Sequence, residues 1–259
     1  MKNRKPIPIW GKKVPYAKGN SKDDIPTLTP YLVENKKSNS CIIIFPGGGY
    51  ITKAPHEKEP IALWLNKIGI SSFVLDYRVS PYKYPIPFID TQRAIRFIRY
   101  NSDRFNIDPN RIGVIGFSAG GHLASCIGVH FDYGENTDNS IESVSSRPDL
   151  LILCYPVISL INFSHKGCIE NLLGENPSEE TLELLSSEKH VKQDTPPCFI
   201  WHTQNDSVVP VEHSILFALA LKEKKLIFNF IFLKKDLMDL DLLKIILMFQ
   251  NGLCYVKTG

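Results

Sequence analysis

The pentapeptide Gly116-Phe117-Ser118-Ala119-Gly120 contains the side chain with the clearest chemical potential in this sequence. It directly follows the apolar stretch 111–115 and opens a helix-like stretch at 120–125. A serine nucleophile of the Gly-x-Ser-x-Gly type requires this strand, turn and helix context, with small neighbours around a strained backbone. We therefore predict that Ser118 is a nucleophile and that the N–H of Ala119 faces a developing oxyanion. The alternative is a structural glycine turn.

A run of three glycines, Gly47, Gly48 and Gly49, follows a second apolar stretch at 41–45. Side chains do not shield backbone N–H groups in such a run, so a substrate can approach them closely, which favours an oxyanion hole. A phosphate-binding loop is the competing interpretation, but the lysine and Ser/Thr that would follow in that motif are missing. A flexible glycine turn is the remaining alternative.

Asp206 lies in a loop, 202–210, between a predicted strand and a predicted helix that begins near Val211. A carboxylate at this position would orient an imidazole and stabilise its charged form during proton transfer. The order serine, then aspartate, along the chain matches the hydrolases that carry the serine motif. The alternative is an aspartate that caps the helix or forms a turn.

A histidine that could complete this set is not evident. All seven histidines precede Leu226, and His213 alone follows Asp206. We expect His213 on the helix after the acid loop, about 10 Å from that loop along the helix axis, and not above Ser118. Two other histidines have structural interpretations: His122 packs on the helix after Ser118, and His202 is a hydrogen-bonded core residue. His56 is a candidate for the pocket wall.

The elements that must position these residues alternate along the chain from residue 41 onward. Apolar runs are separated by amphipathic stretches, which predicts an α/β fold with a mostly parallel central sheet and helices on both faces. The predicted strands are 41–45, 72–75, 111–115, 150–154 and 198–201, and the predicted helices include 61–68 and 89–104.

The length of 259 residues suits a single α/β domain. We assign residues 1–40 to an N-terminal extension and residues about 157–196 to a short insertion or partial lid over the C-terminal edge of the sheet. Residues 226–259 are an atypical C-terminal segment.

The composition is that of an ordinary globular protein, with 43% hydrophobic residues, 22% charged residues and a net charge of +3. This small, scattered charge does not favour nucleic acid as a partner. We find no secretion signal and no apolar run that would span a membrane, so we expect a cytoplasmic protein. The six cysteines are irregularly spaced and are expected to be reduced, mostly buried thiols, and no metal or cofactor is implied. The oligomeric state is not indicated.

These motifs together resemble the bacterial esterase/lipase family of the α/β-hydrolase fold, especially its acetyl esterase and acetylxylan esterase-like branch. The resemblance covers most of the chain to about Lys225, although proline stands at position 46 where many lipolytic relatives have histidine. It is carried by Pro46-Gly47-Gly48-Gly49-Tyr50, by Asp76-Tyr77-Arg78 with Tyr84-Pro85-Ile86-Pro87 and Asp90, by the run from Gly116 to His122, and by the segment from Pro196 to Pro210.

The resemblance implies Ser118 as nucleophile, Asp206 as the acid, and Gly47, Gly48 and Ala119 as oxyanion donors. It also implies a small-molecule ester as substrate, in particular acetyl esters of sugars or xylo-oligosaccharides. The expected activity is that of a serine carboxylesterase that works through an acyl-enzyme. Peptidase activity on the same fold is disfavoured because no substrate-gating domain is evident.

Members of that family carry a Gly-x-His-Gly-like segment after the next strand, and this sequence has none. The run Lys222-Glu223-Lys224-Lys225 implies adenine-rich codons, where a base is easily gained or lost. In a shifted frame, Met238-Asp239 forces a glycine, and residues 236–243 can encode Gly-Pro-His-Gly-Leu-Gly-Leu-Ala. We hypothesise a frameshift near Lys225 that leaves a catalytically impaired or inactive product. The alternative is a diverged terminus, in which 226–232 still forms a strand.

Overall fold

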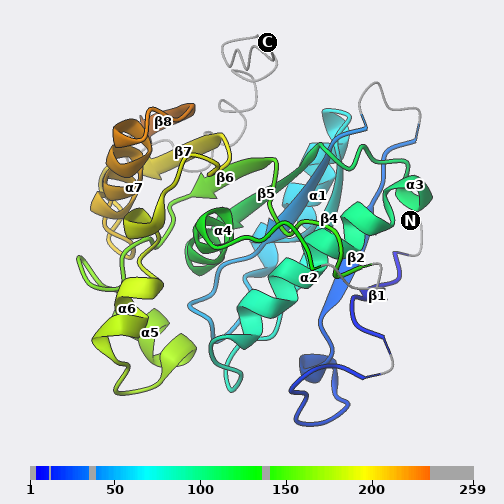
Figure 1. Ribbon diagram of the computed structural model, residues 1–259, viewed down its shortest axis with the longest axis horizontal. Coiled ribbons are helices and arrows are strands. Elements are labelled where there is room, and N and C mark those ends of the chain that lie inside the picture. The colour runs from blue at the N-terminus through cyan, green and yellow to red at the C-terminus, as the bar shows by residue number, and fades with distance from the viewer. Residues whose placement is uncertain (1–3, 12, 35–38, 136–140, 234–259) are drawn as a thin grey trace.

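The computed structural model describes residues 4–11, 13–34, 39–135 and 141–233. In this part of the chain an eight-stranded sheet has the order β1-β2-β4-β3-β5-β6-β7-β8 (Figure 1). Strands β1 and β2 pair antiparallel at one edge, and the others run parallel to one another. The strands are β1 Ile7–Pro8, β2 Thr27–Tyr31, β3 Cys41–Phe45, β4 Ser71–Asp76, β5 Ile112–Phe117, β6 Leu150–Cys154, β7 Cys198–Thr203 and β8 Phe228–Leu233.

The central strands β3 and β5 are continuous apolar runs in which every residue is buried. Such runs are typical of a parallel sheet covered on both faces, because each side chain meets a packed layer. All five strands that the sequence predicts are present, each within two residues of the expected bounds. The strand expected if 226–232 simply diverged is also present, as β8.

Helices cover both faces of the sheet, as predicted. Figure 1 shows α2 and α4 on one face and α1 on the other. The predicted helix 89–104 begins earlier, at Ile86, because Pro87 is tolerated in the first turn, and it gives way to the short α3 after Tyr100. The helices are α1 Glu59–Lys67, α2 Ile86–Tyr100, α3 Ser102–Phe105, α4 Ala119–Val129, α5 Lys166–Leu173, α6 Glu179–Leu184 and α7 Glu212–Glu223, with short 3-10 turns η1 Lys22–Asp24, η2 Pro55–Glu57 and η3 Ser187–His190.

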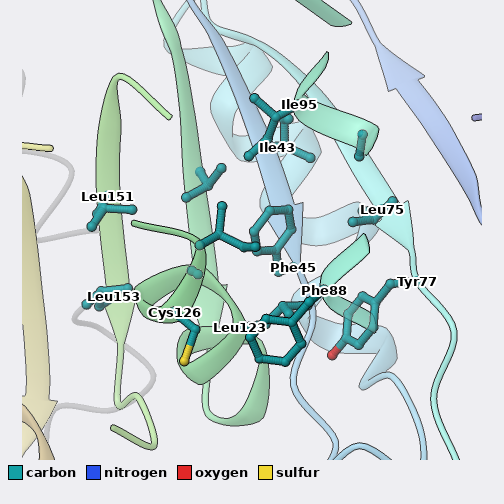
Figure 2. Close-up of a cluster of buried hydrophobic side chains, with 14 of the residues drawn as sticks. Ile43, Phe45, Leu75, Tyr77, Phe88, Ile95, Leu123, Cys126, Leu151 and Leu153 are labelled. Atoms are coloured by element: carbon teal, nitrogen blue, oxygen red, sulfur yellow. The ribbon is translucent and has the colours of Figure 1, made fainter. Parts of the chain in front are cut away.

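The larger hydrophobic core lies between the sheet and the helices α2 and α4. Figure 2 shows sheet side chains such as Ile43 and Phe45 beside Leu123 of α4 and Phe88 of α2. A second core joins the opposite face of the sheet to α1. The five described cysteines are buried and none of them forms a disulfide, in agreement with the predicted reduced thiols, and Cys254 lies outside the described residues.

The side on which successive strands join the sheet changes at β3. The next strand in the sequence, β4, lies on one side of β3, and β5 lies on the other. Ligands of open α/β sheets bind outside the carboxyl ends of the strands at such a switch point. The glycine run 47–49 follows β3 and Ser118 follows β5, so the topology brings both to this edge.

Residues of the predicted insertion, 157–196, form α5, α6 and η3. The predicted extension, 1–40, contributes β1 and β2 to the edge of the sheet. Among the described residues, no helix combines the length and apolarity needed to cross a membrane.

Candidate active site

Ser118 occupies a strained backbone conformation, with φ 50° and ψ −115°, between β5 and α4. Non-glycine residues rarely adopt a positive φ, and such strain persists only where the surroundings fix it. The flanking glycines make the turn possible. A Cβ on Gly116 would lie 2.2 Å from the carbonyl oxygen of Gly120, and one on Gly120 would lie 2.1 Å from the carbonyl oxygen of Phe45.

Three backbone hydrogen bonds hold this turn in place. The N–H of Ser118 donates to Cys154 at 3.0 Å, at the end of β6. Its carbonyl accepts from the N–H groups of His122 at 3.0 Å and Val157 at 3.2 Å. Ala119 is the first residue of α4, where helical N–H groups have no intrahelical acceptor. The turn therefore offers the Ala119 amide beside the serine.

The glycine run after β3 is folded so that its carbonyl groups bond inward. The carbonyl of Gly47 accepts from Ala54 at 2.9 Å, and that of Gly48 accepts from Ile51 and Thr52, each at 3.1 Å. In a trans peptide the N–H points opposite to the C=O of the same unit. The amides of Gly48 and Gly49 therefore point away from the turn, and no hydrogen bond to either is found among the described residues.

The amide of Gly47 has a different environment. It donates to Oε2 of Glu57 at 2.6 Å, so this N–H group is already hydrogen-bonded within the protein. A Cβ on Gly47 would lie 3.1 Å from Cβ of Ser118, so the loop and the serine are in close contact. Glu57 has no distinctive signal in the sequence, because a glutamate among charged residues resembles a solvent-exposed one.

Two further side chains fix the far end of this loop. Nδ2 of Asn171, on α5, donates to the carbonyl of Gly49 at 2.8 Å. The hydroxyl of Tyr50 bonds Nδ1 of His122 at 2.8 Å, inside the core. The predicted insertion thus contacts the glycine loop directly, which the sequence pattern did not indicate.

Asp206 lies after β7, and its side chain is 14% exposed. Oδ1 accepts hydrogen bonds from the N–H groups of Val208 at 2.8 Å and Val209 at 2.9 Å. Asp206 therefore has the turn-forming role that was the alternative to a catalytic one. Oδ2 lies 3.7 Å from Nε2 of His202. One oxygen therefore shapes the loop, while the other is not used in that turn.

The three fully buried histidines use both ring nitrogens. His122 and His202 donate from Nε2 to the carbonyls of Leu185 and Val209, each at 2.8 Å. His213 donates from Nε2 to the carbonyl of Phe163 at 3.0 Å, and its Nδ1 accepts from the N–H groups of Ile158 and Ser159.

Burial is the main cause that lowers the pKa of each of these rings, to about 4 for His122 and His213. Burial likewise lowers the pKa of His202. All three are therefore neutral core residues at pH 7, as the sequence suggested for His122 and His202.

The remaining histidines do not complete the site either. His56 is adjacent to Glu57, with Nε2 3.5 Å from its Oε1, but the side chain is 77% exposed. His130 and His190 donate to the carbonyls of Leu184 and Glu183. All seven histidines lie within the described residues, and no hydrogen bond there joins one of them to the hydroxyl of Ser118.

The strand order, the parallel crossovers and the strained serine turn are those of the α/β-hydrolase fold. Comparison with known proteins specifies the family. The family described as BD-FAE matches residues 28–221. A solved structure, the acetyl ester-xyloside bifunctional hydrolase from Caldicellulosiruptor lactoaceticus, is 48% identical, with a TM-score of 0.89 and coverage of 96% of both chains.

Two curated relatives agree with this match. Endo-1,4-beta-xylanase B of Butyrivibrio fibrisolvens is 44% identical over 208 residues, which cover 79% of this chain and 33% of that protein. Acetylxylan esterase of Xylanibacter ruminicola is 36% identical over 196 residues, covering 74% and 38%. The chain thus spans little more than a third of the length of these relatives. It belongs to the BD-FAE family of α/β-hydrolases, in the acetylxylan esterase-like branch.

Proposed function

We propose that this chain is built to hydrolyse small acyl esters, in particular acetyl esters of sugars or xylo-oligosaccharides, through an acyl-enzyme at Ser118. The observation that carries the proposal is the strained Ser118 turn packed against a loop whose Gly48 and Gly49 amides bond no described residue. The names of the relatives support the choice of acetyl esters and of xylose-based substrates.

In the proposed reaction, Oγ of Ser118 attacks the acyl carbonyl while its proton passes to a histidine held by Asp206. The carbonyl oxygen becomes an oxyanion, which accepts hydrogen bonds from backbone amides. The alcohol leaves with the proton from the histidine, and water then hydrolyses the acyl-enzyme to the free acid. We assign Gly48 and Ala119 as oxyanion donors, with Gly49 in place of Gly47, because Glu57 already accepts the Gly47 hydrogen.

A second proposal concerns the chain as it stands: it is a catalytically impaired product that lacks the triad histidine because of a frameshift near Lys225. The supporting observation is that six of the seven histidines, His165 included, form hydrogen bonds with groups other than Ser118, and that the seventh, His56, is exposed. The segment 236–243, which encodes the expected histidine loop in a shifted frame, lies outside the described residues.

Acetyl release tests the substrate assignment. We define the frame-restored chain as this chain with the reading frame corrected at Lys222–Lys225. We expect it to release acetate from acetylated xylo-oligosaccharides and to prefer p-nitrophenyl acetate over the hexanoate ester, with both activities lost in Ser118→Ala. A preference for the hexanoate ester would contradict the small-acyl assignment, and full activity in Ser118→Ala would contradict the mechanism.

Sequencing the gene across the lysine run tests the second proposal. We expect a single inserted or deleted base near the codons for Lys222–Lys225 and an open shifted frame that encodes the His-Gly segment. A gene in which no shifted frame encodes that segment would exclude the frameshift and leave a diverged terminus.

A further inference from the structure

Glu57 is a buried carboxylate beside the predicted nucleophile. It ends the η2 turn, Pro55–Glu57, and its side chain is 7% exposed. A charge in such a place is costly unless it is hydrogen-bonded. Oε2 accepts the N–H of Gly47 at 2.6 Å, and Oε1 accepts the hydroxyl of Tyr155 at 2.8 Å. Each oxygen thus has a donor from a different strand end, β3 and β6.

The Pro46–Gly47 peptide is held from both sides. Its N–H donates to Glu57, and its carbonyl accepts the buried hydroxyl of Tyr77 at 2.6 Å. A planar peptide bonded at both polar atoms cannot rotate about its flanking dihedrals without breaking a buried hydrogen bond. The next two peptides carry the amides of Gly48 and Gly49, so their direction depends on this anchored unit.

The anchor also lies close to the reacting atoms. A Cβ on Gly47 would be 3.0 Å from Oε2 of Glu57 and 3.1 Å from Cβ of Ser118. Tyr155 closes the same region, since its ring packs against Phe117, the residue before the nucleophile, with centroids 5.9 Å apart. Glu57 therefore joins the glycine loop, which packs against the serine turn, to the end of β6.

We propose that Glu57 is a positioning residue of the oxyanion hole. Its carboxylate removes the Gly47 amide from the reaction and fixes the peptide from which the amides of Gly48 and Gly49 project toward the acyl oxygen. The inference rests on the proposed ester hydrolysis at Ser118, because it assigns Glu57 an effect on the oxyanion formed there. Glu57 acts through the backbone and does not itself touch the substrate.

Substitutions at Glu57 separate this role from simple packing. Glu57→Leu has a similar size but no acceptor for the Gly47 amide. Glu57→Gln keeps one acceptor oxygen for that amide, and its NH₂ can donate to the Tyr155 oxygen once that hydroxyl turns. Glu59→Gln, on the exposed start of α1, is the matched control. If the leucine variant does not fold, Glu57→Asp replaces it, since a side chain one methylene shorter cannot keep the 2.6 Å contact.

Two readouts are measured. The first is the set of Gly47, Gly48 and Gly49 amide signals by NMR in the full chain, which needs no activity. The second is kcat and KM of the frame-restored chain on p-nitrophenyl acetate. We expect Glu57→Leu to move all three amide signals and to lower kcat by about 10-fold or more with KM within about 2-fold. We expect Glu57→Gln to retain most of kcat and Glu59→Gln to match the parent.

Unmoved Gly48 and Gly49 signals in Glu57→Leu would overturn the proposal, and so would moved signals with unchanged kcat. If the frame-restored chain with Glu57 intact fails to hydrolyse the ester, the proposed function has failed. In that case the amide signals alone decide whether Glu57 orients the loop, so the two failures remain distinct.

Discussion

The backbone N–H of Gln204 donates to the carbonyl of Leu233 at 2.8 Å. This bond joins the loop that bears Asp206 to the last residue of β8. Leu233, the last described residue, therefore lies beside the loop of the predicted acid. In the shifted frame, the histidine codon falls about five residues beyond Leu233, a reach of about 17 Å for extended chain. The span from β8 to β5 is three strand spacings, about 14 Å, so such a histidine can reach Ser118.

Asp206→Asn tests the acid. Asparagine keeps an oxygen that can accept the N–H groups of Val208 and Val209, so the turn should persist while the charge is removed. In the frame-restored chain we expect kcat to fall by about 10⁴-fold, because the imidazole loses the partner that fixes its tautomer. In the chain as given, the same change should leave any residual rate unaltered, because no described histidine depends on Asp206 for catalysis. A smaller loss than about 10-fold in the frame-restored chain would reject Asp206 as the acid.

Gly120→Ala tests the tightness of the serine turn. Its new methyl group would meet the carbonyl oxygen of Phe45 at 2.1 Å, a backbone atom that cannot move freely. We expect the free energy of unfolding to fall by about 3 kcal/mol in urea titration. Gly11→Ala is the control, since a Cβ there meets nothing within 4 Å. Equal stability of the two variants would contradict the close approach of β3 and α4.

Asn171→Leu tests the contact between the insertion and the glycine loop. Loss of the hydrogen bond to the Gly49 carbonyl frees the outer end of that loop. We expect kcat of the frame-restored chain to fall about 5-fold, the equivalent of one hydrogen bond worth about 1 kcal/mol. Asn176→Ala, at an exposed position of the same insertion, should leave kcat unchanged. If both variants behave alike, α5 does not control the loop.

Stability should depend on acid through the buried histidines. The pKa of His122 and of His213 is lowered by burial from 6.5 to about 4. Between these values the unfolded chain binds protons that the folded chain does not, so the free energy of unfolding falls as the pH drops from 6.5 toward 4. The loss is on the order of 3 kcal/mol per histidine, and it is absent above pH 6.5.

Urea titrations between pH 4 and 8 measure this dependence. His122→Gln should flatten the slope between pH 4 and 6.5, because glutamine does not titrate. His56→Gln, at a 77% exposed position, is the matched control and should leave the slope as it is. A His122→Gln variant with the parent's slope would show that this ring does not stay neutral in the folded chain.

Elements with strong local signals could be predicted from the sequence. The buried strands β3 and β5 are unbroken apolar runs, and the serine turn has glycines where its neighbours leave no space. The sheet, its helices and the position of Ser118 follow from these patterns. The break between α2 and α3 was not predicted, since the apolar spacing continues across it.

The contacts that complete the loop could not be predicted, because they join distant parts of the chain. Asn171 meets Gly49 across 122 residues, and Tyr155 meets Glu57 across 98. Neither pair has a fixed spacing or a distinctive residue type. The hydrogen bond from Gly47 to Glu57 is also a tertiary contact, so it could not be predicted from the sequence either.

The central claim is that Ser118 lies in a prepared site whose base is missing from this chain. The most direct test is kcat/KM for p-nitrophenyl acetate, measured on the chain as given, on the frame-restored chain and on Ser118→Ala of each. We predict that the given chain is slower than the frame-restored chain by about 10⁴-fold or more, and that Ser118→Ala lowers only the frame-restored rate substantially. A given chain that hydrolyses the ester as fast as the frame-restored chain, and loses this activity in Ser118→Ala, would contradict the claim.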